Sequence, residues 1–166
     1  MIRIGLLSDT HGHLDEKLLS HFEECDEIWH AGDIGETGIA NKLRSLRPLR
    51  AVHGNIDDKN LSAVYPEQQV FHCEEVKVLM RHIAGYPGKY NPLALKEFQL
   101  HNPDLVIAGH SHILRIMYDE KNKFLFMNPG AAGHQGMHLE RTILRFTIDG
   151  KQIRNAEVIE LGKRGR

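Results

Sequence analysis

The sequence predicts a mixed α/β domain in which two β-sheets pack together with helices on their outer faces. Three observations support this prediction. Apolar runs and amphipathic stretches alternate over the first half of the chain, as in a parallel sheet with helical crossovers. Short β-like runs separated by turn residues fill most of the second half. With 166 residues, the chain is long enough to bury the apolar faces of both sheets in one domain.

The first half predicts three strands joined by two helices. Short apolar runs predict strands over residues 2–8, 28–31 and 49–53. Apolar residues at helical spacing, with charged residues opposite them, predict helices over residues 14–25 and 37–46. This order of elements favours parallel strands with right-handed crossovers.

The second half predicts mainly antiparallel structure. Residues 69–73 and 76–80 have the pattern of a tight hairpin, and residues 105–108 form another buried run. A proline near its start supports a helix over residues 92–101. Turn residues separate the remaining apolar runs, which predict antiparallel strands over residues 113–118, 124–127, 142–148 and 152–161.

Composition excludes several classes of protein. The chain is 41% hydrophobic and 26% charged, and 21 basic residues against 22 acidic ones give a net charge of −1, which argues against non-specific nucleic-acid binding. No signal peptide or membrane-spanning run is recognisable, and Cys25 and Cys73 have no paired spacing, so we expect reduced thiols and a cytoplasmic location. We expect one domain over residues 1–161 and a basic, frayed tail over residues 162–166.

Five polar clusters each follow a predicted strand. They are Asp9-Thr10-His11, Gly32-Asp33, Gly54-Asn55, His82 and Gly109-His110-Ser111-His112. Because ligands of open α/β sheets bind beyond the carboxyl ends of strands, these side chains could converge at one place. Carboxylate, imidazole and amide groups are the donors that divalent first-row metals take. The joint order and placement of the clusters therefore predict a metal site.

Each cluster by itself also has a purely structural interpretation. Asp9 could cap the following helix, the two Gly-led dipeptides are good turn sequences, and a lone His82 is more often a hydrogen-bonded core histidine. His110 and His112 are the strongest pair, because residues i and i+2 of an extended segment point the same way. The other histidines are interpreted as structural or surface residues: His13, His21, His30, His53, His72, His101, His134 and His138. Among them, His13 is the first exception to consider, because it lies close to a candidate ligand.

Taken in order, the clusters resemble the motif set of the calcineurin-like metallophosphoesterases. The matching motifs are Asp9-x-His11, Gly32-Asp33, Gly54-Asn55-x-Asp57, His82 and Gly109-His110-x-His112. The chain length and the Asn128-Pro129-Gly130 loop are most similar to the small bacterial and archaeal phosphodiesterase branch. The resemblance covers residues 2 to about 148 and implies a four-layer αββα sandwich of two mixed β-sheets flanked by helices.

The resemblance also implies a centre of two divalent metal ions, with Mn²⁺ expected first and Zn²⁺, Fe²⁺ or Ni²⁺ as alternatives. The implied ligands are Asp9, His11 and His112 for one ion, Asn55, His82 and His110 for the other, and Asp33 as a bridge between them. The implied reaction is hydrolysis of a small phosphoester, most specifically a phosphodiester, by a hydroxide that bridges the two ions. The implied catalytic residues are Asp9, Asp33, Asn55 and His110. Neither a membrane nor a stable nucleic-acid partner is expected, and homo-oligomerisation is left open.

The sequence departs from the family pattern at three places. Ile56 stands where many members have a histidine that protonates the leaving group, and the nearest acid, Asp57, is expected to be ionised. Ser111 replaces the usual threonine and keeps its hydroxyl. Arg81 precedes His82, and residues 83–88 replace the usual Gly-His, which changes the local substrate loop. Because histidines bind metal only when neutral, metal is expected to leave as the pH falls below about 6.

Two alternatives to an enzyme follow from the same residues. The resembling branch includes a retromer subunit that is regarded as an interaction protein, so a non-catalytic scaffold on this fold is the chief alternative. A second alternative is a protein that only stores or senses metal. All seven implied ligand positions are filled, and a bridging Asp33 beside an open pocket would be superfluous for storage, so both patterns favour the enzyme.

Overall fold

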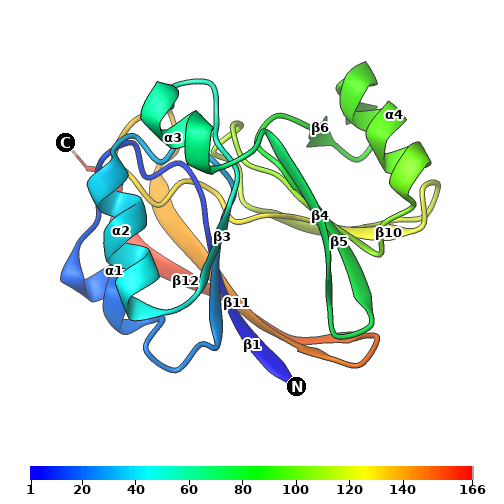
Figure 1. The fold of residues 1–166 in the computed structure, drawn as a ribbon, viewed down its shortest axis with the longest axis horizontal. Helices are drawn as coiled ribbons and strands as arrows, with labels where there is room; N and C mark the ends of the chain where they lie inside the picture. The colour runs from blue at the N-terminus through cyan, green and yellow to red at the C-terminus, as the bar shows by residue number, and fades with distance from the viewer. Residues whose placement is uncertain (166) are drawn as a thin grey trace.

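Two five-stranded β-sheets pack face to face in the computed structural model, which describes residues 1–165 (Figure 1). The strands of the first sheet are β1 (Ile2–Leu7), β2 (Glu27–His30), β3 (Leu49–Ala51), β11 (Glu140–Asp149) and β12 (Gln152–Lys163), in the spatial order β12-β11-β1-β2-β3. Those of the second are β4 (Gln68–Cys73), β5 (Val76–Arg81), β8 (Leu105–Ile107), β9 (Arg115–Asp119) and β10 (Phe124–Asn128), in the order β4-β5-β8-β10-β9. Strands β6 (Gly85–Tyr86) and β7 (Lys89–Tyr90) form a separate small hairpin.

Helices cover the outer faces of both sheets. Helices α1 (Glu16–Ser20) and α2 (Thr37–Leu46) lie against the first sheet, and α4 (Pro92–His101) lies against the second (Figure 1). The bounds of α2 and α4 are those predicted. The side chain of Asn91 caps α4, and Pro92 follows at the first helical position, where its missing N–H costs nothing. The observed layers confirm the predicted four-layer sandwich of two mixed sheets.

The core consists of one layer between the sheets and one under the helices on each side. Between the sheets, the ring of Trp29 contacts those of Phe71 and Phe146 edge to face, with centroids 5.1 Å and 5.8 Å apart. Under α1, Phe22 packs onto Gly5 of β1, where an added Cβ would come within 2.5 Å of the ring. Leu7 of β1 belongs to the layer under the helices, and Ile4 and Leu6 belong to the layer between the sheets, as expected of a central strand.

Two helices differ from the prediction. The helix predicted over residues 14–25 is shorter in the structure, where it is α1. The helix begins after Asp15, whose side chain accepts a hydrogen bond from Leu18 N, and it ends at Ser20, after which tight i→i+3 turns follow. The residue that caps this helix is therefore Asp15, whereas the cap considered from the sequence was Asp9. Helix α3 (Lys59–Val64), capped by Asp58, was not predicted, because it buries only Leu61 and shows no apolar stripe.

The second half of the chain is less antiparallel than predicted. Strand β10 pairs antiparallel with β9, but it pairs parallel with β8, which in turn pairs parallel with β5. The hairpin of β11 and β12 returns to the first sheet, where β11 lies antiparallel beside β1. Apolar periodicity marks a strand but does not choose its neighbour, so these long-range pairings were beyond the sequence pattern.

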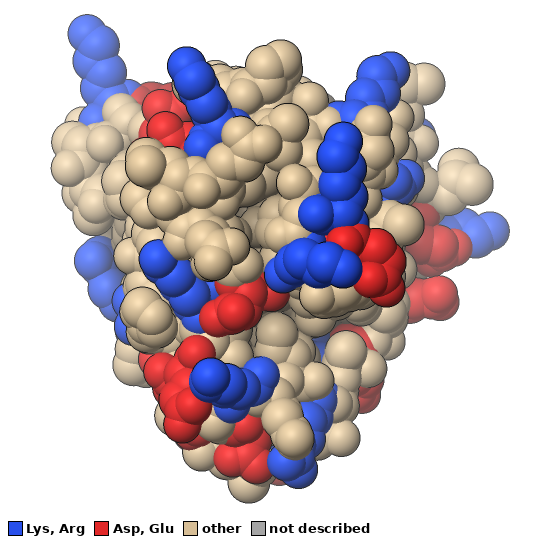
Figure 2. Space-filling view, turned by 90° about the vertical axis from the view of Figure 1, so that its right-hand side faces the viewer, with Lys and Arg blue, Asp and Glu red and all other residues tan. Residues whose placement is uncertain are grey.

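The tail predicted to be frayed carries hydrogen bonds. Strand β12 continues to Lys163, and the backbone N–H of Arg164 donates to the carbonyl of Leu139 at 2.8 Å. The last residue, Arg166, lies outside the described residues. Within residues 1–165, no helix is both long enough and apolar enough to cross a membrane. On the face shown in Figure 2, basic and acidic side chains are intermixed, in keeping with the net charge of −1.

Candidate metal centre

The five polar clusters leave the carboxyl ends of strands in both sheets and meet at one end of the sandwich. Strands β1, β2 and β3 of the first sheet lead to the clusters that begin with Asp9, Gly32 and Gly54, and β5 and β8 of the second lead to His82 and Gly109. Backbone hydrogen bonds join the loops, since Asp9 N donates to Gly32 O and Gly109 N donates to His82 O, both at 3.0 Å. The convergence predicted from strand placement is thus present.

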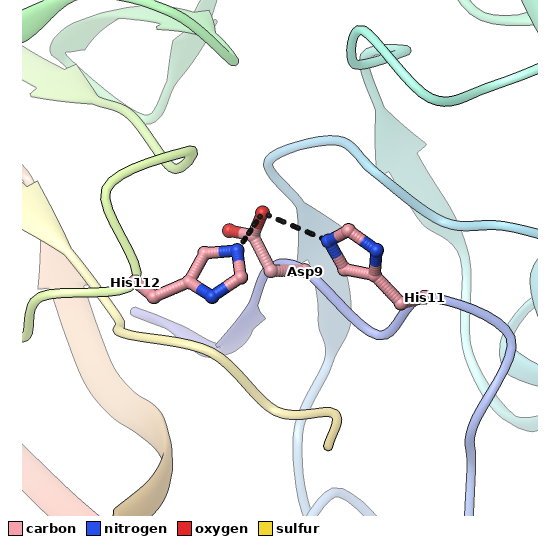
Figure 3. A group of neighbouring side chains, drawn as sticks. All are labelled: Asp9, His11 and His112. Carbon is pink, nitrogen blue, oxygen red and sulfur yellow. Dashed lines mark ion pairs between the residues drawn. The ribbon is translucent and has the colours of Figure 1, made fainter. Parts of the chain in front are cut away.

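The first group of candidate ligands is Asp9, His11 and His112. Asp9 lies between the two imidazole rings, which approach its carboxylate from different sides (Figure 3). Its Oδ1 atom is 3.1 Å from Nε2 of His112 and 3.6 Å from Nε2 of His11. Donor atoms that each lie about 2.0–2.2 Å from one cation are separated by roughly 3–3.6 Å, so this spacing suits a shared ion.

The second group is Asp33, His82 and His110. Oδ2 of Asp33 lies 3.1 Å from Nε2 of His82 and 3.4 Å from Nε2 of His11, which belongs to the first group. One carboxylate oxygen thus faces both groups at once. This position is the one that a bridging carboxylate needs, because it supplies negative charge to two neighbouring cations.

Asn55 approaches the second group from its exposed side. Its Oδ1 lies 3.0 Å from Nδ1 of His110, a separation that suits a hydrogen bond without metal and also two donors of one cation. All seven residues predicted as ligands therefore lie in one cluster, with Asn55 at its rim.

The donor atoms at the middle of the cluster fit a metal site. Among the described residues, four buried side-chain atoms lack a hydrogen-bond partner, and three of them are Asp9 Oδ1, His11 Nε2 and His82 Nε2. Buried polar atoms are nearly always paired, so three unpaired atoms aimed at one place need a partner that protein groups do not supply. A divalent cation satisfies carboxylate and imidazole donors together.

Hydrogen bonds on the far side of each ligand fix which atom faces the cluster. Oδ2 of Asp9 accepts from Ser8 Oγ at 2.7 Å and from His110 N at 3.1 Å, which leaves Oδ1 toward the centre. Nδ1 of His82 lies 2.8 Å from the carbonyl of Ala31, so Nδ1 carries the proton and Nε2 presents its lone pair. None of these partners was predicted. Ser8 is the neighbour of Asp9, but His110 and Ala31 lie 101 and 51 residues from the ligands they contact.

The loops that carry the ligands have unusual backbone conformations. Five candidate ligands have a positive φ, between 47° and 70°: Asp9, His11, Asp33, His110 and His112. Such angles are uncommon outside glycine and cluster at functional sites. Gly54 serves a different purpose, because an added Cβ would lie 2.0 Å from Oδ1 of Asp33. This glycine lets the loop after β3 approach the carboxylate.

Charge in the cluster alters the ionisation of its members. Burial disfavours the charged form of Asp9, yet the nearby histidines outweigh it and hold the pKa of this carboxyl well below its usual range. The pKa of Asp33 is lowered in the same way by His11 and His82, against its burial. In return, the carboxylates of Asp33 and Asp9 raise the pKa of His11 to about 9. Burial and the neighbouring His82 lower the pKa of His110.

Metal affinity should therefore rise with pH well beyond the range predicted from free imidazole. In the metal-free protein His11 keeps its proton up to about pH 9, and this proton must leave before Nε2 can bind a cation. We expect Mn²⁺ affinity to increase between about pH 7 and pH 9, with release of roughly one proton from His11 per chain. Calorimetric titrations in buffers of different ionisation enthalpy measure this release. An affinity independent of pH over this range would contradict the assignment of His11.

His30 is buried beneath the cluster and stays neutral. Gly32 N donates to its Nδ1 at 3.1 Å, so the proton is on Nε2, which donates to Thr10 Oγ1 at 3.0 Å. The hydroxyl of Thr10 in turn donates to Ile34 O at 2.8 Å. The network links the loops that carry the ligands. Burial lowers the pKa of His30 to about 4.

This network should make the protein less stable in acid. As the pH falls below about 6.5 the unfolded chain takes up a proton on His30, whereas the folded chain does so only near pH 4, so unfolding is favoured. Because of His30, we expect the free energy of unfolding to fall by about 2 kcal/mol when the pH is lowered from about 7.5 to about 5. Urea unfolding of chelator-treated wild type and His30→Asn, which retains an acceptor for Gly32, measures the difference. An equal fall in the free energy of unfolding in both proteins would contradict this role of His30.

Two residues near the cluster, His13 and Asp57, lie outside both ligand groups. His13 belongs to neither ligand group, since it lies 3.3 Å from Asp15 and packs against the ring of His134. The carboxylate of Asp57 accepts from the backbone N–H groups of residues 34, 35 and 54, at 2.8–3.2 Å, and so ties the loop after β2 to the loop after β3. These bonds occupy both carboxylate oxygens of Asp57.

Comparisons with known proteins agree with the geometry. A family model described as the calcineurin-like phosphoesterase superfamily domain matches residues 2–151. A probable metallophosphoesterase of Methanothermobacter thermautotrophicus is 28% identical over 96% of this chain and 92% of its own. A phosphodiesterase of Methanocaldococcus jannaschii is 26% identical over 78% of this chain and 83% of its own.

Solved structures show the same fold. An archaeal phosphodiesterase superposes with a TM-score of 0.75 at 22% identity, over 95% of this chain and all of the other. Vps29 of Entamoeba histolytica in complex with Zn²⁺ superposes with a TM-score of 0.76 at 15% identity, over 99% of this chain and all of the other.

Proposed function

Because the chain belongs to the calcineurin-like phosphoesterase superfamily, we propose that it is a metal-dependent phosphodiesterase that hydrolyses small phosphoesters. The observation that carries the proposal is the set of unpaired donor atoms on Asp9, His11 and His82. The two histidine nitrogens of this set face one carboxylate oxygen of Asp33. A phosphodiesterase among the relatives supports the finer assignment.

The proposed division of ligands follows the two groups. Asp9, His11 and His112 hold one ion, Asn55, His82 and His110 hold the other, and Asp33 bridges them. When bound, two divalent ions activate water as a nucleophile and polarise the phosphoryl oxygens. We propose Mn²⁺ as the ion, with Zn²⁺, Fe²⁺ or Ni²⁺ as alternatives, because imidazole and carboxylate donors accept all of them.

The residues themselves supply position and charge. Asp9, Asp33, Asn55 and His110 are the proposed catalytic residues. Asp33 faces both groups, Asp9 and His110 each belong to one of them, and Asn55 adjoins the second. Asn55 is neutral and exposed, so the centre retains more positive charge for an anionic substrate than a third carboxylate would leave. Ile56 N donates to Oδ1 of Asp33 at 3.1 Å, which leaves Oδ2 toward the histidines.

A panel of phosphoesters tests the proposal. We expect protein reconstituted with Mn²⁺ to contain two ions per chain after gel filtration and to hydrolyse bis-p-nitrophenyl phosphate. Chelator-treated protein should be inactive and should recover when Mn²⁺ is returned. Binding of no more than one ion per chain at saturation would overturn the dinuclear assignment, and two bound ions without hydrolysis of any ester would favour the scaffold.

The scaffold alternative is supported by the structural likeness to Vps29. The filled ligand positions favour the enzyme.

We also propose a cytoplasmic location, because Cys25 and Cys73 are buried as free thiols in different core layers and cannot pair without rearrangement.

A further inference from the structure

A histidine in the loop over residues 133–139 contacts a ligand of the first group. We propose that His138 is a positioning residue that orients His112 toward the metal centre. The inference rests on the metal centre proposed above. His138 was interpreted from the sequence as a structural or surface residue, since it lies 26 residues from His112 and matches no motif.

The hydrogen bonds of His138 determine where its proton lies. Its Nε2 is 2.9 Å from the carbonyl oxygen of Gly133. A carbonyl only accepts, so Nε2 carries the proton and donates it to Gly133. In the neutral ring, Nδ1 of His138 then has no proton and presents an acceptor.

This acceptor faces His112. The Nδ1 atoms of the two rings are 3.3 Å apart, and the rings meet edge to face with centroids 5.1 Å apart. Because Nδ1 of His138 accepts, Nδ1 of His112 must carry the proton and donate. Its Nε2 is then left with a lone pair, and this atom lies 3.1 Å from Oδ1 of Asp9. His138 thus selects the form of His112 that can bind a cation at Nε2.

The same task is performed by a backbone carbonyl at His82. Nδ1 of His82 lies 2.8 Å from the carbonyl oxygen of Ala31, which no side-chain replacement removes. At His112 the acceptor is itself a side chain. The affinity of the first group can therefore be tested, separately from that of the second, by a substitution that changes no ligand.

Hydrogen bonds from the side chain and the backbone of Arg164 hold the loop of His138 in place. Nε of Arg164 donates to the carbonyl of His138 at 2.9 Å, and Arg164 N donates to the carbonyl of Leu139 at 2.8 Å. Gly136 lies against the His112 ring, where an added Cβ would be 2.1 Å from Nδ1. The side chains of Met137 and Leu139 are 94% and 81% exposed. A substitution at position 138 therefore leaves the contacts of Arg164 and the core unchanged, and removes only the hydrogen bonds of the His138 side chain with Gly133 and His112.

Three variants test the proposal by Zn²⁺ binding, measured in competition with a chromophoric chelator. His138→Leu removes the acceptor, His138→Asn keeps an oxygen near the position of Nδ1, and His72→Leu makes the same replacement at an exposed histidine of β4. Loss of a partner behind a metal-bound histidine weakens binding by about 10–100-fold. We expect this loss for one of the two ions in His138→Leu, and near wild-type binding in the other two variants.

A second measurement is independent of affinity. In Zn²⁺-loaded wild type, the Nδ1 proton of His112 should give a solvent-protected NMR signal at low field. The signal should vanish in His138→Leu and remain in His138→Asn, while far-ultraviolet circular dichroism and melting temperature show that the variants are folded.

The outcomes separate this inference from the proposed function. A wild type that binds two Zn²⁺ ions while His138→Leu binds both equally well overturns the role of His138 and leaves the metal centre intact. If folded His138→Leu binds both ions equally weakly, the role of His138 is also overturned, because His112 belongs to one group only. A wild type that binds no Zn²⁺ overturns the proposed metal centre and this inference together.

Discussion

Replacement of Asp33 by alanine is expected to abolish binding of both metal ions and to lower kcat/KM for a phosphodiester by at least about 10³-fold, or roughly 4 kcal/mol. The physical reason is the position of one oxygen. Oδ2 of Asp33 lies 3.4 Å from Nε2 of His11 in the first group and 3.1 Å from Nε2 of His82 in the second. Without it, each group loses a negative charge, and the carboxylate that His11 and His82 still share, that of Asp9, lies farther from them, at 3.6 Å and 3.8 Å.

The comparison with His112→Ala makes this prediction specific. His112 belongs to the first group only, so its replacement should weaken the binding of one ion and leave the binding of the other unchanged. Metal analysis after gel filtration and steady-state kinetics measure both effects. Asp149→Ala, at the exposed end of β11, is the matched control and should retain two ions and full activity. Equal metal loss in the Asp33 and His112 variants would contradict a bridging role for Asp33.

The second large effect concerns the leaving group. We expect the wild type to cleave an aryl diester such as bis-p-nitrophenyl phosphate about 10²–10⁴-fold faster than a matched alkyl ester, because an alkoxide needs a proton and a positioned acid contributes about this factor. Ile56 cannot supply a proton, although its side chain is 45% exposed beside the centre. Asp57 is occupied by three backbone N–H groups. Diesters should also react faster than monoesters, whose second negative charge repels an anionic nucleophile.

Installing the missing acid tests this explanation. Ile56→His should raise kcat/KM for the alkyl ester more than for the nitrophenyl ester, whose leaving group needs no proton. Ile56→Leu preserves the apolar character of the position and should leave the aryl preference unchanged. Parallel kinetics on matched esters with the three Mn²⁺-loaded proteins measure both effects. A wild type that hydrolyses an alkyl monoester as fast as the aryl diester would show that position 56 does not determine the preference.

Local signals in the sequence were enough to predict much of the fold. The bounds of α2 and α4 follow from apolar spacing and from a proline at the start of α4, and both are local properties of about ten residues. The sheets could be predicted as two packed layers, because buried runs alternated with helices and then with turns. Where the local signal was weak the prediction failed, as at α3 with its single buried Leu61.

Donor types at the ends of the strands were enough to predict a metal site from the sequence, and the family resemblance implied its seven ligands. Three features became evident only in the folded chain: the pairing of β10 with β8, the atom of Asp33 that faces both groups, and the contact of His138 with His112. The reason is physical. Periodicity and capping act between residues a few positions apart, whereas these contacts join residues brought together by packing of two sheets, and no local pattern records them.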